Sequence, residues 1–368
     1  MLLPASTCAL DTVVLSREGQ QQTIEGKLLV TARDGGMLLL DPTGVLWAIQ
    51  PDEIVQHTHD ERPFEPLSDD EMAAALLAEL PEGFRVHKTA NYIICYNTSR
   101  EYAQWCGGLL ERLQRAFTNY WDHRGLEIQE PELPLVAIVF ADAQSYRQYS
   151  QKELGEAAGS IVGYYSLRTN RVTMYDLTGV QALRRPGSRR GSIENINRML
   201  SQPQAGPLVA TVVHEATHQI AFNCGMHTRY ADIPLWVSEG IALYFETPDL
   251  SSGRGWRGIG SINPPRLATF RRNLPHRTIG MLPSLIADDR RMREVTPGAD
   301  AYAEAWALCY YLIHRRPKEF VEYLTMLSEK PQLVWDEPEQ RLTEFREYFG
   351  EDLQALEQDF LRQIQTVR

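Results

Sequence analysis

The sequence has no long hydrophobic run and no pair of cysteines two residues apart. Its longest apolar stretch, residues 133–140, is far shorter than the roughly 20 residues that a helix needs to cross a bilayer, so no membrane span is expected. The five cysteines include no C-x-x-C pair, which argues against a thiolate zinc site and against a disulfide framework. Cys106 and Cys309 fall in apolar helical patterns and are expected to be buried thiols.

Positive charge is also scarce. The formal net charge of -11 gives no general attraction to nucleic acid or to anionic lipid, so no nucleic-acid partner is expected. The only dense basic stretch, residues 184–192, is rich in Gly, Pro and Ser and is expected to be a mobile loop, with phosphate binding as the weaker alternative. Residues 1–10 have no basic start and are interrupted by Pro4 and Ser6, which makes them a poor secretion signal. A soluble protein is expected, and the compartment stays open, since a signal missing from this chain is one alternative.

The composition is that of a folded globular protein, with 43% hydrophobic and 23% charged residues. Residues 1–60 are expected to form a small β-barrel-like module, because short apolar runs alternate with Gly and Asp turn signals. Residues 61–84 are expected to be a linker and a helix, in which Ser68 and Glu71 form a capping box. The four strands expected in the module lie at residues 23–31, 36–40, 44–49 and 53–57.

The rest of the chain changes from alternating elements to helices. Residues 85–204 are expected to form a mixed α+β sheet subdomain, and residues 205–368 an all-helical subdomain that carries the candidate site. Strands are expected at residues 91–97, 134–140, 160–167 and 171–177, and helices at 99–124, 143–154, 207–224, 234–247, 299–314, 317–330 and 352–365. The fold class is therefore α+β: a β-module, a sheet subdomain, then helices.

One of these helices carries the strongest chemical pattern, His214-Glu-Ala-Thr-His218. Residues four apart lie one above the other on a helix, so both imidazoles can reach a single ion. Glu215 would lie beside that ion, where a base for water is needed. The alternative is an ordinary amphipathic helix whose polar residues happen to fall this way, and the pattern alone is only moderately specific.

A catalytic zinc needs a third protein ligand and an open position. Glu239, in the next predicted helix, follows His218 after enough residues for the chain to reverse. Gly240 beside it is expected to allow the two helices to approach closely, and Glu246, two turns on, is a natural acceptor for the ring N–H of a ligand histidine. The alternative for Glu239 is a solvated carboxylate on a helix surface.

H-E-x-x-H followed by "WVSEGIALYFE" resembles the gluzincin metallopeptidases. It resembles more closely the peptidase-MA-like bacterial proteins of unassigned function, whose second helix reads W-x-x-E-G-x-A-x-Y-x-E. The stretches "NYIICYNTSREYAQW", "PLVAIVF", "GYYSLRTNRVTMYD" and "AYAEAWALCYYL" extend the resemblance over residues 85–330. It implies a zincin-like sheet, one Zn²⁺ held by His214, His218 and Glu239, and Glu215 as the general base of peptide hydrolysis by a metal-activated water.

The resemblance also implies a further donor to the substrate oxyanion from the helical part. Tyr302 is the best-placed candidate, with Tyr310, Tyr311 and His314 as rivals, and the alternative is that all four simply pack a helix. In zincin-like folds an edge strand pairs with an extended substrate, and residues 171–176 would suit such an edge. A plain hairpin is compatible with the same residues.

Three further histidines are weaker candidates. His57 and His59 are expected at the end of a surface strand rather than on a metal, and His227 is expected close enough to line the site. The leading hypothesis is a zinc-dependent metallopeptidase that acts on a peptide or protein substrate. The alternatives are a non-catalytic, zinc-stabilised binding or scaffold protein and a metal-dependent hydrolase of another amide or ester. No oligomeric state is indicated.

Overall fold

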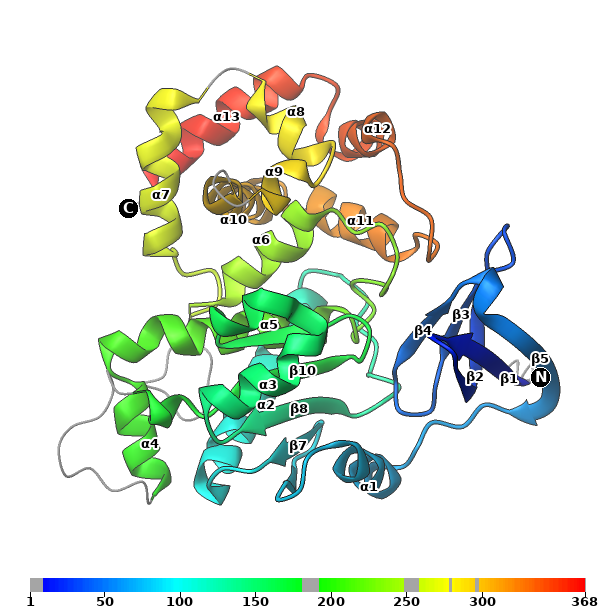
Figure 1. Ribbon diagram of the computed structural model, residues 1–368. Helices are drawn as coiled ribbons and strands as arrows, with labels where there is room; N and C mark the ends of the chain where they lie inside the picture. The colour runs from blue at the N-terminus through cyan, green and yellow to red at the C-terminus, as the bar shows by residue number, and fades with distance from the viewer. Residues whose placement is uncertain (1–8, 181–191, 248–257, 278–279, 295–297, 368) are drawn as a thin grey trace, which may run out of the picture.

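The computed structural model describes residues 9–180, 192–247, 258–277, 280–294 and 298–367. These ranges form an N-terminal antiparallel sheet, a second, mixed sheet flanked by helices, and a C-terminal set of helices (Figure 1). The α+β fold class predicted from the sequence is confirmed. The basic stretch at residues 184–192 lies outside the described residues except for Ser192, which caps a helix.

The N-terminal module is a five-stranded antiparallel sheet in the order β4-β3-β2-β1-β5. No ladder joins β4 to β5 in the described part of the chain, so the expected barrel is an open sheet. The first strand was not predicted, and the last runs three residues past the boundary expected at residue 60. The strands are β1 Ala9–Arg17, β2 Gln20–Thr31, β3 Met37–Leu40, β4 Leu46–Ile49 and β5 Ile54–Pro63.

The module packs against the rest of the chain through one of its two small clusters. Leu38, Leu40 and Leu46 are buried together and contact Tyr230 and Leu333, which come from distant parts of the chain. The Leu46 N–H also donates to the Arg168 carbonyl over 2.8 Å. The module is therefore fixed to the body of the protein by apolar burial and by backbone hydrogen bonds.

A single helix, α1 Asp69–Glu79, connects the two sheets. The predicted capping box is confirmed, since the Ser68 hydroxyl accepts from the Glu71 N–H and the Glu71 carboxylate accepts from the Ser68 N–H.

The second sheet has the order β6-β7-β8-β10-β9, with parallel pairs at its centre and antiparallel pairs at both ends. Helices cover both of its faces: α2, α4 and α5 lie on one, α1 and α3 on the other. The predicted strands are present, while β6 and α4 were not predicted. The elements are β6 Arg85–Lys88, β7 Tyr92–Tyr96, α2 Arg100–Asp122, β8 Leu135–Phe140, α3 Ala143–Leu154, β9 Gly163–Ser166, β10 Arg171–Tyr175 and α4 Ile193–Leu200.

The C-terminal helices surround α10 Gly298–Arg315, which contacts five of them. Helices α7, α8, α9 and α12 were not predicted. No helix in the described ranges combines the length and the apolar character that a bilayer crossing requires. The other helices of this part are α5 Gly206–Ala221, α6 Leu235–Phe245, α7 Pro264–Asn273, α8 Met281–Ile286, α9 Arg290–Arg293, α11 Pro317–Ser328, α12 Pro338–Phe349 and α13 Leu353–Thr366.

Gly240 allows a close helix approach, but with a different partner from the expected one. A side chain at this position would meet Cys309 Sγ at 2.4 Å and the Ala305 carbonyl oxygen at 2.7 Å. Both atoms belong to α10, so the glycine brings α10 against α6 rather than α6 against α5. Cys106 and Cys309 are both buried free thiols, as predicted.

Candidate metal site

Helix α5 presents two histidines to a cleft while its opposite face is buried. The helix has Pro207 in its first turn, where a residue without a backbone N–H costs no hydrogen bond within the helix. Its apolar side chains pack into the main core, which leaves His214 and His218 on a partly exposed face. The buried apolar residues are Val209, Val212, Val213, Ala216, Ile220 and Ala221.

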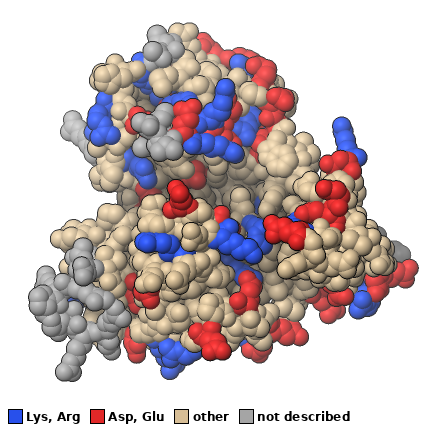
Figure 2. All heavy atoms as spheres, viewed as in Figure 1, with Lys and Arg blue, Asp and Glu red and all other residues tan. Residues whose placement is uncertain are grey.

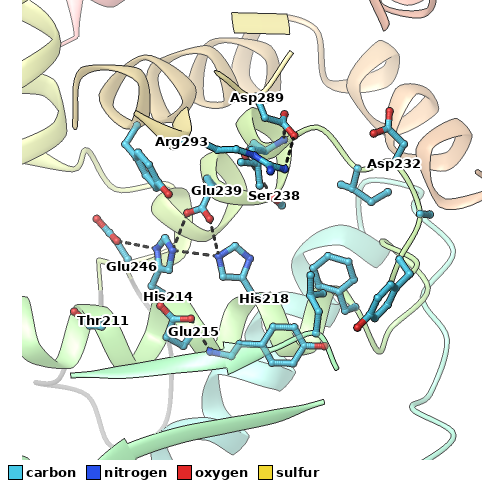
Figure 3. A pocket seen from close by; sticks show the side chains of 18 of the residues that line it. Thr211, His214, Glu215, His218, Asp232, Ser238, Glu239, Glu246, Asp289 and Arg293 are labelled. Atoms are coloured by element: carbon cyan, nitrogen blue, oxygen red, sulfur yellow. Dashed lines mark hydrogen bonds and ion pairs between the residues drawn. The ribbon is translucent and has the colours of Figure 1, made fainter. Parts of the chain in front are cut away.

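The third residue comes from α6. The His214 Nε2 atom lies 3.1 Å from Glu239 Oε2 and 3.2 Å from His218 Nε2. The His218 Nε2 atom lies 3.6 Å from Glu239 Oε1. These are the only three side chains in the described ranges whose ligand atoms converge in this way, all within 4.8 Å of one another. The predicted residues therefore form a group that can bind a metal ion (Figure 3).

A second layer of contacts fixes the His214 ring. Its Nδ1 atom lies 3.2 Å from Glu246 Oε2, directly after the end of α6. The other oxygen of Glu246 accepts from the Asn263 amide at 2.7 Å and from Arg266 Nε at 3.4 Å. Asn263 and Arg266 belong to the start of α7, a helix that the sequence reasoning did not identify. Only the capping preference of Asn263 could have indicated it.

The three groups perturb one another electrostatically. Burial alone would lower the pKa of His214, but the carboxylates of Glu239 and Glu246 raise this pKa to about 10. Burial raises the pKa of Glu239, and the opposing effect of His218 and His214 is larger, so the pKa lies well below its usual range. The Glu239 carboxylate thus favours the protonated form of His214, and a bound metal ion would supply the same positive charge.

Glu215 lies in the same cleft and is held by the second sheet. Its Oε2 atom accepts from the Tyr165 N–H in β9 at 2.8 Å. Burial raises the pKa of Glu215, and the neighbouring His214 and His218 oppose this rise. The expected edge strand, β10, is an interior strand between β8 and β9, and β9 is the edge beside the cleft. The contact with Glu215 could not be predicted because a backbone N–H carries no residue-specific signal.

Tyr302 in α10 also lines the cleft. The close approach of α10 to α6 at Gly240 accounts for this, since Tyr302 lies one turn before Ala305. Burial, followed by the charges of Glu239 and Glu215, raises the pKa of the Tyr302 phenol. The rival candidates lie elsewhere: Tyr310 and His314 pack against Tyr244, and Tyr311 donates to Asp359 at 2.7 Å.

The cleft has a volume of about 580 Å³ and lies between the helical and the sheet-bearing halves of the molecule. Figure 2 shows the surface hollowed between these two halves. Beyond the metal-binding group, it is lined by residues that sequence reasoning did not single out. They are Tyr165, Leu167, Thr211, Phe222, Tyr230, Ala231, Asp232, Ile233, Leu235, Ser238, Arg266, Asp289, Arg293 and Trp335.

Comparison with known families covers the same region. A family model described as "Protein of unknown function (DUF1570)" matches residues 208–334. No curated protein matches the chain. The DUF1570 region begins in α5 and contains the His-His-Glu group together with Glu215, Glu246 and Tyr302. The match does not include residues 85–207 and names no peptidase family, so the expected resemblance to the gluzincin metallopeptidases stays a prediction over its whole length.

Two histidines outside the DUF1570 region contact a carboxylate. His57 Nε2 lies 2.7 Å and His59 Nδ1 lies 3.1 Å from the same oxygen of Asp11, across the β1–β5 ladder. They lie within β5 rather than at a strand end. Asp11 is the ladder partner of His59, and His57 reaches it diagonally across the same ladder.

Inside the DUF1570 region, His227 is buried against Phe222 rather than lining the cleft. Its Nδ1 atom lies 2.9 Å from the Met226 carbonyl oxygen, and its Nε2 atom has no hydrogen-bond partner in the described residues. Burial lowers the pKa of His227 to about 3. The folded protein therefore holds this ring in its neutral form.

This buried ring makes the folded state sensitive to acid. Below the ordinary histidine pKa of 6.5 the unfolded chain binds a proton that the folded chain does not bind until about pH 3. Stability is therefore present above pH 6.5 and falls between 6.5 and 3, by up to about 1.4 kcal/mol per pH unit. We expect His227→Gln to reduce the loss of unfolding free energy between pH 6.5 and 5 by about 2 kcal/mol, measured by urea denaturation with chelator present.

The exposed His123 offers a matched control, because His123→Gln removes an imidazole without altering a buried site. Equal pH slopes for the wild type and His227→Gln would contradict the prediction.

Proposed function

We propose that this protein is a zinc-dependent peptidase of the gluzincin type, in which His214, His218 and Glu239 hold the ion. The observation that carries the proposal is the convergence of two imidazole nitrogens and a carboxylate at 3.1 to 3.6 Å in an open cleft. Tetrahedral zinc with bonds of about 2.0–2.2 Å requires ligand atoms roughly 3.3–3.6 Å apart. Three protein ligands leave one position for water or substrate, as in catalytic rather than structural zinc sites.

Zinc bound there supplies Lewis acidity, which lowers the pKa of water and polarises a carbonyl group. The residues of this chain supply the proton transfers. The Tyr165 N–H donates a hydrogen bond to Oε2 of Glu215. The other oxygen, Oε1, is left to accept a proton from the attacking water and to return it to the leaving amine. The Tyr302 phenol, whose raised pKa keeps it protonated even well above neutral pH, is a donor for the substrate oxyanion.

Glu246 acts through His214 in this proposal. Its carboxylate contacts Nδ1 of the ring and thereby directs Nε2 towards the ion. The Asn263 amide in turn orients the carboxylate.

The deciding experiment compares the wild type with Glu215→Gln after both are loaded with zinc and incubated with a proteome-derived peptide pool. We expect the wild type to cleave peptides and the variant to be slower by roughly 10²- to 10⁴-fold, because a general base is removed. Zinc content should stay near one per chain in both proteins. Glu319→Gln, the same change at a helix-surface residue of α11, is the control and should leave cleavage unchanged.

Two outcomes would contradict the proposal. If the zinc-loaded wild type cleaves no peptide in the pool, the peptidase assignment is wrong. If Glu215→Gln loses its zinc, Glu215 belongs to the metal-binding group rather than acting as a base.

A further inference from the structure

The cleft continues past the metal-binding group in the direction away from Glu246. In Figure 3, Glu246 lies on one side of the His214–His218 pair and Asp232 on the other. The Asp232 end includes Phe222, which follows His218 by one helical turn, and Tyr230 and Ile233 from the α5–α6 connection. Trp335 completes this wall, and 62% of its surface is exposed. An indole so exposed beside three further apolar side chains leaves a surface that a ligand can cover.

The acidic groups at this end are already neutralised. Asp232, only 2% exposed, accepts two hydrogen bonds from the Arg341 guanidinium at 2.6 and 2.9 Å. Asp289 accepts from Arg341 at 2.9 Å and from the Leu235 N–H at 3.1 Å. Because both carboxylates have strong partners, this part of the cleft has no free negative charge to select a basic side chain.

The guanidinium of the neighbouring Arg229 is also occupied by contacts within the protein. Arg229 Nη1 donates to the carbonyls of Gly44 and Leu167 at 3.0 and 3.1 Å. Its guanidinium makes no ion pair in the described ranges, and burial lowers its pKa. These contacts direct the charge into the protein, towards the β9–β10 turn and the N-terminal module. An acidic ligand side chain would therefore gain little from Arg229. Arg293, which lines the cleft, is exposed, and its guanidinium pairs with Asp289 at 3.4 Å.

The wall is fixed by several independent contacts. The Leu333 N–H donates to the Tyr230 carbonyl at 2.8 Å, and the Gln332 amide donates to the Arg229 carbonyl at 2.7 Å. Directly after Trp335, Asp336 forms an ion pair with Lys330. The segment that carries the indole is thus held at both ends.

The backbone conformation also indicates that this wall of the cleft is fixed. Tyr230 and Leu333 both have positive φ angles, of 64° and 60°, although neither is a glycine. Such conformations are strained for residues that carry a side chain and persist only where the surrounding structure imposes them. Here the N-terminal module imposes them, since both side chains pack against its Leu38, Leu40 and Leu46. The module therefore shapes this wall of the cleft.

We propose that the Asp232 end of the cleft is a subsite for one bulky apolar side chain, aromatic or large aliphatic, of a peptide. The side chain would lie against Trp335, Tyr230 and Phe222, with the peptide backbone passing the metal-binding group. The inference rests on the proposed peptidase function for the identity of the ligand. It adds the selectivity of that site and assigns Trp335 as a specificity-determining residue.

The test measures binding apart from cleavage. Zinc-loaded Glu215→Gln protein is titrated by calorimetry with blocked hexapeptides that carry Phe, Leu, Ala, Lys or Glu at one position at a time in an otherwise Ala-Gly sequence. We expect one position at which Phe and Leu bind roughly fivefold to tenfold more tightly than Ala, Lys or Glu. Adding Trp335→Ala should abolish this preference, while Trp335→Phe should retain most of it.

Val334→Ala is the matched control, because Val334 is exposed and adjacent to Trp335 but does not line the cleft. The subsite is refuted if the preference for Phe and Leu is as strong in Trp335→Ala as in Val334→Ala. It is also refuted if the parent protein shows no apolar preference at any position. Wild-type cleavage of the pool without such a preference would leave the peptidase proposal standing and the subsite refuted. An apolar preference in binding without any cleavage of the pool would leave the subsite standing and refute the peptidase proposal.

Discussion

Glu239→Ala is expected to lower zinc affinity by more than a hundredfold, which is the largest effect on metal binding that the site predicts. Replacing a partner that only touches a ligand typically lowers metal affinity 10- to 100-fold, and Glu239 itself would supply an oxygen to the ion. The variant also leaves His214 and His218 with their Nε2 atoms 3.2 Å apart and no carboxylate between the two helices. Two imidazoles on one helix are a much weaker site than three ligands from two helices.

The loss is measurable without any substrate. Zinc present at a thousand times its dissociation constant stabilises the folded state by about 4 kcal/mol, and a hundredfold weaker site retains only about 1.4 kcal/mol of this. Chelator competition and thermal unfolding with and without zinc should report the same change. Glu246→Gln should lie between the wild type and Glu239→Ala, because Glu246 contacts His214 rather than the ion.

A surface variant controls for the loss of a carboxylate as such. Glu319→Ala, in α11, should bind zinc like the wild type. If Glu239→Ala binds zinc as tightly as Glu319→Ala, the three side chains do not act as one site and the proposed function loses its basis.

The sequence was sufficient for the parts of this site that depend on local geometry. A spacing of four residues on a helix places His214 and His218 on one face, whatever surrounds the helix. The capping box at Ser68 and the four predicted strands of the second sheet follow equally local rules. Glu239 was identified by its position in an apolar helix, where a carboxylate needs a buried partner.

The predictions that were wrong or missing depend on which elements become neighbours in the fold. Alternation along residues 171–176 shows that they form a strand but not that β9 lies outside it, since strand order is set by packing across the whole sheet. Gly240 indicates a close approach but not its partner, which is α10. Trp335 gave no signal because its role at the wall comes from a bridge between residues one hundred apart, Ala231 and Gln332.

Arg341→Met is the second change from which a large effect is expected, here on stability. Arg341 is buried in α12, and its guanidinium binds Asp232 through two hydrogen bonds and Asp289 through a third. Burial opposes the charge, but the two aspartates raise the pKa of Arg341 further above its ordinary value. Removing the arginine leaves the buried Asp232 with Lys330, at 3.8 Å, as its one remaining ion-pair partner among the described residues. Breaking such a buried pair costs about 3–5 kcal/mol of unfolding free energy.

Urea denaturation of Arg341→Met and Arg346→Met separates a buried pair from an exposed one. Arg346 lies on the same helix and pairs with Glu339, which is 77% exposed, so Arg346→Met should cost less than about 1 kcal/mol. Equal destabilisation by the two variants would contradict the prediction.

A second substitution tests the reason for the loss. If the isolated carboxylate is what destabilises Arg341→Met, then adding Asp232→Asn should recover part of the lost stability, because a neutral amide is cheaper to bury. The ion pairs also connect to the candidate site, since Asp289 accepts from the Leu235 N–H at the start of α6, the helix that carries Glu239. Arg341→Met should therefore weaken zinc binding as well, and Arg346→Met should not. A loss of both stability and metal affinity in Arg341→Met alone would show that α6 is held in place at its first residue, Leu235, one turn before Glu239.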